Sequence, residues 1–465
     1  MGRIEFGADG IRGIAGEWPL VAPVAVQIGQ ALGRFVCNRS DHPCAVIGRD
    51  TRPSGERLLH NLVAGLVGHG VDVIDLGVMT TPGVAFLTRR IEADLGIIVS
   101  ASHSSLEYNG IKLVTGNGLR LQREEEIEVE LLIEESITNN SGHAVDLGQE
   151  IDGQNLIELY VWDHVEYCRA KSLKGLNIVL DCANGAASWV APEAFKLLGV
   201  DVTILNCALE GTSINYHCGS EHTREHPREF AQIVQQHEAQ YGFAFDGDGD
   251  RLVVVDEHGQ LFDGNDLLFA LAMHYHSQGL LRGNAVVTTR IANRGLEEAL
   301  SGLGIRTVHT SKGDKNLEAA MWGSDYMLGG EVGGNIIIND SHHTAADAVY
   351  AALVLGEMLV EHDDGLGKLI DDQGLKKRPQ KTRSFKLSGS LNLDQKEMLK
   401  NQIRAKEKEL GENGRILHWE SSTEPGVYRV MVEGGRESTV EEVEEVAEAT
   451  CRLIQRVAES NGEER

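Results

Sequence analysis

The segment Tyr241–Asp256 has the sequence YGFAFDGDGDRLVVVD, in which three aspartates alternate with two glycines between two apolar runs of β type. Glycine has no Cβ, so the backbone can turn tightly there and bring Asp246, Asp248 and Asp250 together. At about 4 Å and an effective dielectric constant of about 20, two carboxylates repel each other by roughly 4 kcal/mol, so their convergence requires a cation. Oxygen ligands alone suit a hard ion such as Mg²⁺ or Ca²⁺ rather than zinc.

Two other structures are compatible with part of this pattern. Asp-Gly pairs also form ordinary hairpin turns. An EF-hand would use the three aspartates and Glu257 at loop positions 1, 3, 5 and 12, but it needs glycine at position 6, where this chain has Arg251. Its flanks would also be helices, whereas these flanks are strand-like. The segment therefore predicts a divalent-ion site between two strands.

The composition is that of an ordinary globular chain, with 42% hydrophobic and 24% charged residues. A length of 465 residues allows about three domains with large buried cores. The formal net charge of −27 argues against nucleic-acid binding and against adhesion to anionic membranes. If the ligand is an anion, the site must gather its positive charge locally.

The cysteines indicate a reducing compartment. There are seven, an odd number, and no CxxC pair is present. We expect reduced, structural thiols in a cytoplasmic protein. The first residues lack the apolar core of a signal peptide, and no run approaches 18 apolar residues, so no membrane segment is expected.

Helices and strands alternate along most of the chain, which predicts an α/β fold with largely parallel, covered sheets. The alternation occurs in three successive stretches and indicates three α/β units of similar build. The expected helices are Val24–Cys37, Arg57–Val67, Ala191–Leu198, Gly295–Leu303 and Asn316–Trp322, and the expected strands are Ala45–Gly48, Val71–Leu76, Ala93–Val99, Asn177–Asp181, Val202–Asn206, Ala285–Thr289 and Ile305–His309.

The last part of the chain has a different order. The charged segment Asp371–Arg383 predicts a linker or exposed hinge. A strand, a helix over Asp394–Leu410, two strands around Ile416–Val432 and a helix over Thr439–Val457 then predict a small α+β domain. We expect domains at residues 1–152, 153–256, 257–372 and 373–465. The Glu-rich segment Arg123–Glu135 predicts only a solvated helix face.

A second segment with chemical groups is Leu95–Leu113, LGIIVSASHSSLEYNGIKL, where an apolar strand runs into a loop of small and polar residues. Ser102 beside His103 suggests a serine hydrolase. However, adjacent residues of an extended segment point to opposite sides, and the chain has no G-x-S-x-G elbow. A hydroxyl in such a loop, with Lys112 nearby and a metal site elsewhere, favours phosphoryl transfer over acyl transfer.

SASH, NGIK and DGDGDR in this order resemble the α-D-phosphohexomutases, and among them the bacterial phosphoglucosamine mutases. The resemblance covers essentially the whole chain. Further motifs that carry it are FGADGIRG (Phe6–Gly13), GRDTRPSG (Gly48–Gly55), DCANGA (Asp181–Ala186), CGS (Cys218–Ser220), KGDK (Lys312–Lys315), GGE (Gly329–Glu331), STEP (Ser422–Pro425) and RVMVEG (Arg429–Gly434).

The resemblance implies a cytoplasmic four-domain enzyme that interconverts hexose 6-phosphates and hexose 1-phosphates, with glucosamine phosphate as the lead substrate. It implies that Ser102 is the phosphorylated serine and that Ser102, Asp246, Asp248 and Asp250 bind one Mg²⁺. A hexose 1,6-bisphosphate would be the intermediate and activator. Phosphomannomutase, phosphoglucomutase or a catalytically weak phosphosugar-binding paralogue are the alternatives, and a homodimer is compatible with the resemblance.

The other roles implied by the resemblance fall on both the catalytic and the sugar-binding side. Proton transfer and phosphate contacts match His103, Lys112, Arg12 and Arg251. Substrate contacts match Glu331, Gly333, Asn335, Lys315, Ser421, Ser422, Thr423 and Arg429.

Three stretches depart from the family pattern. Ser104-Ser105 stands where Asn-Pro is usual. The sugar loop is GGEVGGN instead of GGEQSGH, so that Gly333 replaces a serine and Asn335 a histidine. Trp419 stands where the phosphate cradle has an arginine. The sequence therefore predicts that the substrate side, rather than the catalytic side, has changed, with weak binding of glucosamine 6-phosphate.

Overall fold

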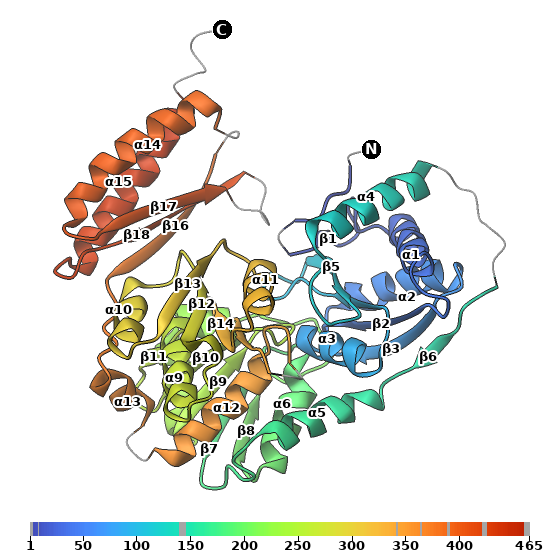
Figure 1. Cartoon of the computed structure of the whole chain (residues 1–465), viewed down its shortest axis with the longest axis horizontal. Helices are drawn as coiled ribbons and strands as arrows, with labels where there is room; N and C mark the ends of the chain where they lie inside the picture. Colours follow the sequence, from blue (N-terminus) through green and yellow to red (C-terminus); the bar gives the residue numbers. More distant parts are fainter. Residues whose placement is uncertain are drawn as a thin grey trace. The chain divides into compact units, whose positions relative to one another are not determined.

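The computed structural model describes residues 3–7, 9–138, 146–340, 343–362, 365–387, 391–420 and 426–459 (Figure 1). The chain divides into two compact units, one of residues 1–290 and 304–372 and one of residues 291–303 and 373–465. Among the described residues, no helix combines the length and the hydropathy that a membrane crossing requires. All seven cysteines are free thiols, as expected.

The first sheet of the larger unit has the order β1-β5-β4-β2-β3-β6. Strands β2, β3, β4 and β6 are parallel, whereas β5 is antiparallel to both β4 and β1. The elements are β1 (Ile11–Ile14), α1 (Ala22–Cys37), β2 (Cys44–Arg49), α2 (Pro53–Val67), β3 (Asp72–Val78), α3 (Thr81–Arg90), β4 (Leu95–Val99), β5 (Tyr108–Thr115), α4 (Arg123–Thr138), β6 (Glu150–Asp152) and α5 (Leu156–Tyr167).

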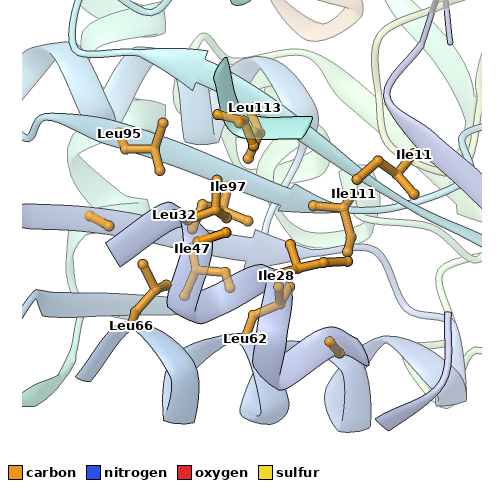
Figure 2. Packing of buried hydrophobic residues seen from close by; sticks show 14 of the residues in the cluster. Ile11, Ile28, Leu32, Ile47, Leu62, Leu66, Leu95, Ile97, Ile111 and Leu113 are labelled. Carbon is orange, nitrogen blue, oxygen red and sulfur yellow. The ribbon is translucent and has the colours of Figure 1, made fainter. Parts of the chain in front are cut away.

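Apolar side chains cover both faces of this sheet. Figure 2 shows Ile47 and Ile97 of the sheet packed with Ile28 of α1 and Leu62 of α2. Neighbouring strand residues point to the opposite face, where a Cβ on Gly48 would lie 2.7 Å from a methyl of Val84 in α3. Burial on both faces explains why these strands are almost uniformly apolar rather than alternating.

The second and third sheets also combine parallel strands with one antiparallel strand, which is β10 in the second sheet and β15 in the third. Their orders are β11-β10-β9-β7-β8 and β13-β12-β14-β15. The elements are β7 (Asn177–Asp181), α6 (Ala187–Leu197), β8 (Asp201–Leu205), α7 (Gly219–Glu225), α8 (Pro227–Gln236), β9 (Tyr241–Phe245), β10 (Leu252–Asp256), β11 (Leu261–Phe262), α9 (Gly264–Ser277), β12 (Ala285–Thr289), β13 (Arg306–Thr310), α11 (Asp314–Ser324), β14 (Leu328–Gly330), β15 (Ile336–Ile338), α12 (Ala348–Glu361) and α13 (Leu366–Asp372).

The smaller unit contains an antiparallel sheet of order β16-β18-β17 and its own apolar core. Leu399, Val430 and Ile454 are fully buried in that core. The elements are α10 (Arg294–Gly302), β16 (Gln380–Lys386), α14 (Leu393–Glu407), β17 (Arg415–Glu420), β18 (Val427–Glu433) and α15 (Val440–Glu459).

Three expectations need correction or qualification. Gln380–Arg383 belongs to β16, and Arg378 is buried in contact with Glu298, so the predicted linker is limited to the residues between α13 and β16. Strand β11 pairs with β10, so the second sheet extends past the predicted boundary at residue 256. The helix α4 is not merely solvated, because Glu126 and Glu130 are buried. The division of the larger unit into three domains remains a prediction.

Candidate active site

The DGDGD segment connects the antiparallel strands β9 and β10, and its three aspartates converge as predicted. Asp246, Asp248 and Asp250 are buried, and one carboxylate oxygen from each lies within 4.8 Å of the others. Gly249 has φ of +72°, a left-handed conformation that favours glycine. A Cβ on Gly247 would lie 2.6 Å from the carbonyl oxygen of Ser102. The two glycines therefore allow the turn and the close approach of a second loop.

That second loop follows β4 and carries Ser102, which is 2% exposed. Ser102 Oγ donates a 2.6 Å hydrogen bond to Asp246 Oδ2. The loop is not extended, since Ser102 has φ of +52°. As a result, His103 Nδ1 lies 3.2 Å from Ser102 Oγ, and the expectation that the two side chains point apart is wrong. Burial and the charge of Arg251 lower the pKa of His103 to about 3.

Arg52 holds the serine loop in this shape. Its guanidinium is fully buried and donates to the carbonyl oxygens of Ser102 at 2.9 Å and Ser104 at 2.6 Å. It also donates to the carbonyls of Ser105 at 2.5 Å and Tyr108 at 3.1 Å. Four carbonyl groups of one loop are thus satisfied by one side chain, which fixes the direction of the nucleophile.

Two more side chains support Arg52 and the serine loop. Asp50 accepts from Arg52 Nε at 3.0 Å and from Ser100 Oγ at 2.6 Å. Asn215, from the second sheet's region, donates to the Ser102 carbonyl at 2.8 Å. The motif GRDTRPSG contained Asp50 and Arg52, but nothing in the sequence around Asn215 indicated a contact 113 residues away.

Positive charge gathers beside the aspartates, as an anionic ligand requires. Lys112 is fully buried, and its Nζ lies 2.7 Å from Asp248 Oδ2 and 3.6 Å from Asp250 Oδ2. Asp9, which the sequence analysis did not single out, contacts Lys112, Arg12 and Arg120. One carboxylate therefore orients three cations at the site.

The aspartates carry uncompensated repulsion. Burial and the neighbouring carboxylates raise the pKa of Asp246 well above its ordinary value. Burial and the Asp248 carboxylate raise the pKa of Asp250 to about 7. Burial also opposes ionisation of Asp248, but Lys112 outweighs it and lowers the pKa of Asp248. A bound cation would remove the repulsion that Asp246 and Asp250 experience.

Comparisons with known proteins find relatives that span almost the whole chain. Models of the phosphoglucomutase/phosphomannomutase alpha/beta/alpha domains I, II and III match residues 3–140, 158–259 and 263–374. A phosphoglucosamine mutase of Ruthia magnifica subsp. Calyptogena magnifica is 38% identical over 92% of this chain and 95% of its own. That of Clostridium novyi is 37% identical over 98% and 100%.

The chain belongs to the phosphoglucomutase/phosphomannomutase family.

A solved phosphoglucomutase/phosphomannomutase family protein from Burkholderia thailandensis has the same fold, with a TM-score of 0.80 at 25% identity over 99% of both chains. The four-sheet architecture described above is therefore that of the phosphohexomutases, and the chain is a hexose phosphate mutase, an isomerase.

Two departures from the family pattern, Gly333 and Asn335, lie in the loop that was predicted to bind the sugar, and Asn335 lies next to an aspartate. Asn335 Nδ2 is 3.3 Å from Asp250 Oδ1, and Asn335 forms an isolated β-bridge with Arg251. Arg251 in turn donates to Glu221 at 2.6 Å. A Cβ on Gly333 would lie 3.5 Å from the Asn335 side chain, so a serine there would be in contact with it.

Two other predicted sugar-side residues are engaged within the protein. Glu331 accepts a hydrogen bond from the backbone of Gly313 at 2.8 Å. Lys315 Nζ lies 2.8 Å from a carboxylate oxygen of Glu126 in α4. This ion pair joins α4 to α11 across 189 residues of sequence, so neither partner's sequence context could have predicted it.

In the smaller unit, the predicted phosphate cradle is described in part. Ser421, Ser422 and Thr423 lie outside the described residues. Trp419 on β17 pairs directly with Arg429 on β18. Directly opposed residues of antiparallel strands project from the same face, so the arginine is a neighbour of the tryptophan that stands in place of the family's arginine.

The three aspartates fit a hard divalent cation. The atoms that they offer to a metal are all oxygens, and the buried Asp248 Oδ1 has no hydrogen-bond partner among the described residues. Asp246, Asp248 and Asp250 would hold such an ion beside Ser102 Oγ, where it would reduce charge on a phosphoryl group.

Proposed function

We propose that this mutase moves a phosphoryl group between O6 and O1 of a hexose phosphate, with Ser102 as the covalent carrier. The observation that carries the proposal is the position of Ser102 Oγ, 2.6 Å from the first of three converging aspartates and held by the buried Arg52. The lead substrate is glucosamine 6-phosphate, because the relatives named above are phosphoglucosamine mutases at 37–38% identity.

Phosphoryl transfer at Ser102 proceeds in two steps. In the first, the bond between phosphorus and Ser102 Oγ breaks while a bond to the free sugar hydroxyl forms, giving a hexose 1,6-bisphosphate. The hydroxyl proton passes to a base of the chain, and Ser102 Oγ regains a proton. The bisphosphate then reverses its orientation in the site, and its other phosphoryl group is transferred to Ser102 Oγ by the reverse chemistry. Because the transition state is charged and loose, positioning and charge neutralisation are the main requirements.

The protein's own groups are assigned accordingly. We assign proton exchange at Ser102 Oγ to His103, since its Nδ1 is 3.2 Å away. We assign charge stabilisation to Lys112, which lies 2.7 Å from Asp248, and phosphate contacts to Arg12 and Arg251. Glu331, Gly333, Asn335, Lys315 and the segment with Ser421, Ser422, Thr423 and Arg429 are assigned to the sugar and its distant phosphate.

We propose Mg²⁺ as the ion held by the aspartates, with phosphorylated Ser102 completing the set. When bound, it supplies neutralisation of charge on the transferred group. The N-acetylphosphoglucosamine mutase of Aspergillus fumigatus, which has the same fold with TM-scores of 0.66 and 0.67, has been solved with GlcNAc-6P and magnesium and with glucose 1,6-bisphosphate.

The test is a panel of glucosamine, glucose and mannose 6-phosphates assayed with the matching 1,6-bisphosphate as activator. We expect the highest kcat/KM for glucosamine 6-phosphate, loss of turnover in EDTA and its recovery with Mg²⁺. Peptide mass analysis should find phosphate on Ser102, and Ser102→Ala should lose both the phosphate and the turnover. Ser40→Ala is the matched control and should retain both.

Near-normal turnover by Ser102→Ala would overturn the covalent mechanism. Preference for glucose or mannose phosphate would retain the mechanism and replace the lead sugar. Tight phosphosugar binding without turnover of any sugar would identify a binding paralogue instead.

A further inference from the structure

A second cluster of metal-ligating side chains lies in the larger unit, apart from the aspartates. It consists of His164 on α5, His343 in the loop after β15, and Asp347, the N-cap residue of α12. One ligand atom of each lies within 4.8 Å of the others. The three residues are 0%, 3% and 4% exposed, so the cluster is buried.

His343 has the orientation that metal-binding histidines have. Its Nδ1 lies 3.1 Å from both carboxylate oxygens of Asp340, so this nitrogen carries the proton and donates it. The ring stacks on Tyr350 at 3.8 Å, and the Tyr350 hydroxyl donates to Asp340. Nε2 is buried and has no hydrogen-bond partner among the residues that the structure describes. A carboxylate on one imidazole nitrogen fixes the ring and leaves the other nitrogen's lone pair for a metal.

His164 and Asp347 are already at a suitable separation. His164 Nε2 lies 3.0 Å from Asp347 Oδ2, and two ligands with bonds of about 2.0 Å to a tetrahedral ion are about 3.3 Å apart. A metal bound through Nε2 of His164 would leave the ring proton on Nδ1. Asp347 is held by the Tyr160 hydroxyl at 2.8 Å and the Tyr350 backbone at 2.9 Å.

We propose that His164, His343 and Asp347 form a buried site for a divalent transition-metal ion of the zinc class. Two imidazole nitrogens and one carboxylate suit zinc, whereas the oxygen-only aspartates suit magnesium. A cluster held only by hydrogen bonds would leave Nε2 of His343 unpaired in the interior, which is unfavourable. The proposal does not depend on the proposed sugar.

The expected role of this ion is structural. Tyr160 also accepts a hydrogen bond from Thr80 at 3.4 Å, and Thr81 donates to Asp248 at 2.5 Å. The first residue of α12, Ala348, donates its backbone N–H to Gly249 at 3.2 Å. An ion between α5 and α12 would therefore fix both helices. Helix α12 contacts the aspartate turn directly, and α5 contacts Thr80, the neighbour of Thr81.

The experiment uses the full chain, stripped with a chelator and returned to excess Mg²⁺, which occupies the aspartates. Zn²⁺ is then titrated in competition with a chromophoric chelator. We expect one Zn²⁺ per chain with a dissociation constant below about 1 μM. His343→Ala and His164→Gln should weaken binding at least about a hundredfold, and Asp340→Asn by about ten- to a hundredfold. Co²⁺ in place of Zn²⁺ should give the intense visible bands of a tetrahedral ion in the wild type but not in His343→Ala.

The half-buried His222 and the exposed His226, whose ring centroids are 4.8 Å apart, provide the control. The double variant His222→Gln/His226→Gln should bind Zn²⁺ as the wild type does. The proposal would be overturned if the wild type bound no Zn²⁺ at concentrations up to about 100 times the expected dissociation constant. It would also be overturned if His343→Ala bound Zn²⁺ as tightly as the wild type. If His164→Gln does not fold, His343→Ala and Asp340→Asn still decide the result.

Discussion

At the scale of single residues, Arg52 determines where Ser102 points, although its side chain was not among the predicted site residues. We expect Arg52→Lys to lower kcat/KM by about ten- to a hundredfold. An ammonium group is a point charge without the guanidinium's planar fork, so part of the four-carbonyl arrangement is lost. An unpaired buried carbonyl costs about 1–3 kcal/mol. Steady-state kinetics and the extent of Ser102 phosphorylation are the measurements.

Arg57 on α2, which is exposed, is the matched control, and Arg57→Lys should leave both quantities unchanged. If Arg52→Lys retains full kcat/KM with normal phosphorylation, then Asp50 and Asn215 suffice to hold the loop.

Trp419 is the single residue that we expect to affect substrate affinity. An arginine makes paired, charge-assisted hydrogen bonds to phosphate, whereas an indole has a single N–H donor. Hydrogen bonds to charged groups are worth about 1.5–3 kcal/mol, so Trp419→Arg should increase kcat/KM for glucosamine 6-phosphate by about ten- to a hundredfold. Because Arg429 lies directly opposite Trp419, the single substitution Arg429→Ala should lower kcat/KM for this substrate.

Trp189→Arg, on the exposed side of α6, controls for the loss of a tryptophan. If Trp419→Arg leaves kcat/KM unchanged or lowers it for every phosphosugar, then Trp419 contributes to a different substrate specificity. Glucosamine 6-phosphate would then be the wrong lead substrate.

The catalytic residues were predictable where one short segment contains the whole pattern. Alternating aspartates and glycines imply convergence, and the structure has it. The relation of Ser102 to His103 was not predictable by alternation, because a left-handed residue changes the direction of the next side chain. The contacts of Asn215 and the Lys315–Glu126 pair were not predictable either, since each joins segments that only the tertiary fold brings together.

At the scale of elements, α11 contains a buried acid whose titration should affect stability. Burial, which outweighs the opposing charge of Arg120, raises the pKa of Glu318 to about 7. Below its unfolded pKa near 4.5, the contribution of Glu318 to stability is fully present. It is lost as pH rises through about 7, because the unfolded chain then binds fewer protons than the folded one.

We therefore expect Glu318→Gln to raise the free energy of unfolding relative to the wild type, by a difference that grows from pH 5 to pH 8. The upper limit is on the order of 3 kcal/mol. Urea unfolding at several pH values measures it. Glu134→Gln, exposed on α4, should show no such trend. A constant difference across pH would mean that Glu318 titrates normally.

At the scale of the whole molecule, each of the two units has a separate apolar core, so we expect two calorimetric transitions. Leu399→Ala in the smaller unit should destabilise only one of them, by about 2–5 kcal/mol. Leu62→Ala in the larger unit should affect the other. A single transition that both variants shift equally would mean that the units unfold cooperatively.

The helix α10 is grouped with the smaller unit although it precedes the third sheet's last three strands in sequence. Its Glu298 pairs with Arg378 and Arg436, and the backbone of Arg294 donates to Glu433. The backbone therefore passes between the units three times, after residues 290, 303 and 372. Consequently no single cleavage can yield both units intact. A fragment ending at Asp372 would keep α10 without these partners, and a fragment beginning at Gln373 would lack the helix, so dissection requires excising residues 291–303 and supplying them to the C-terminal piece.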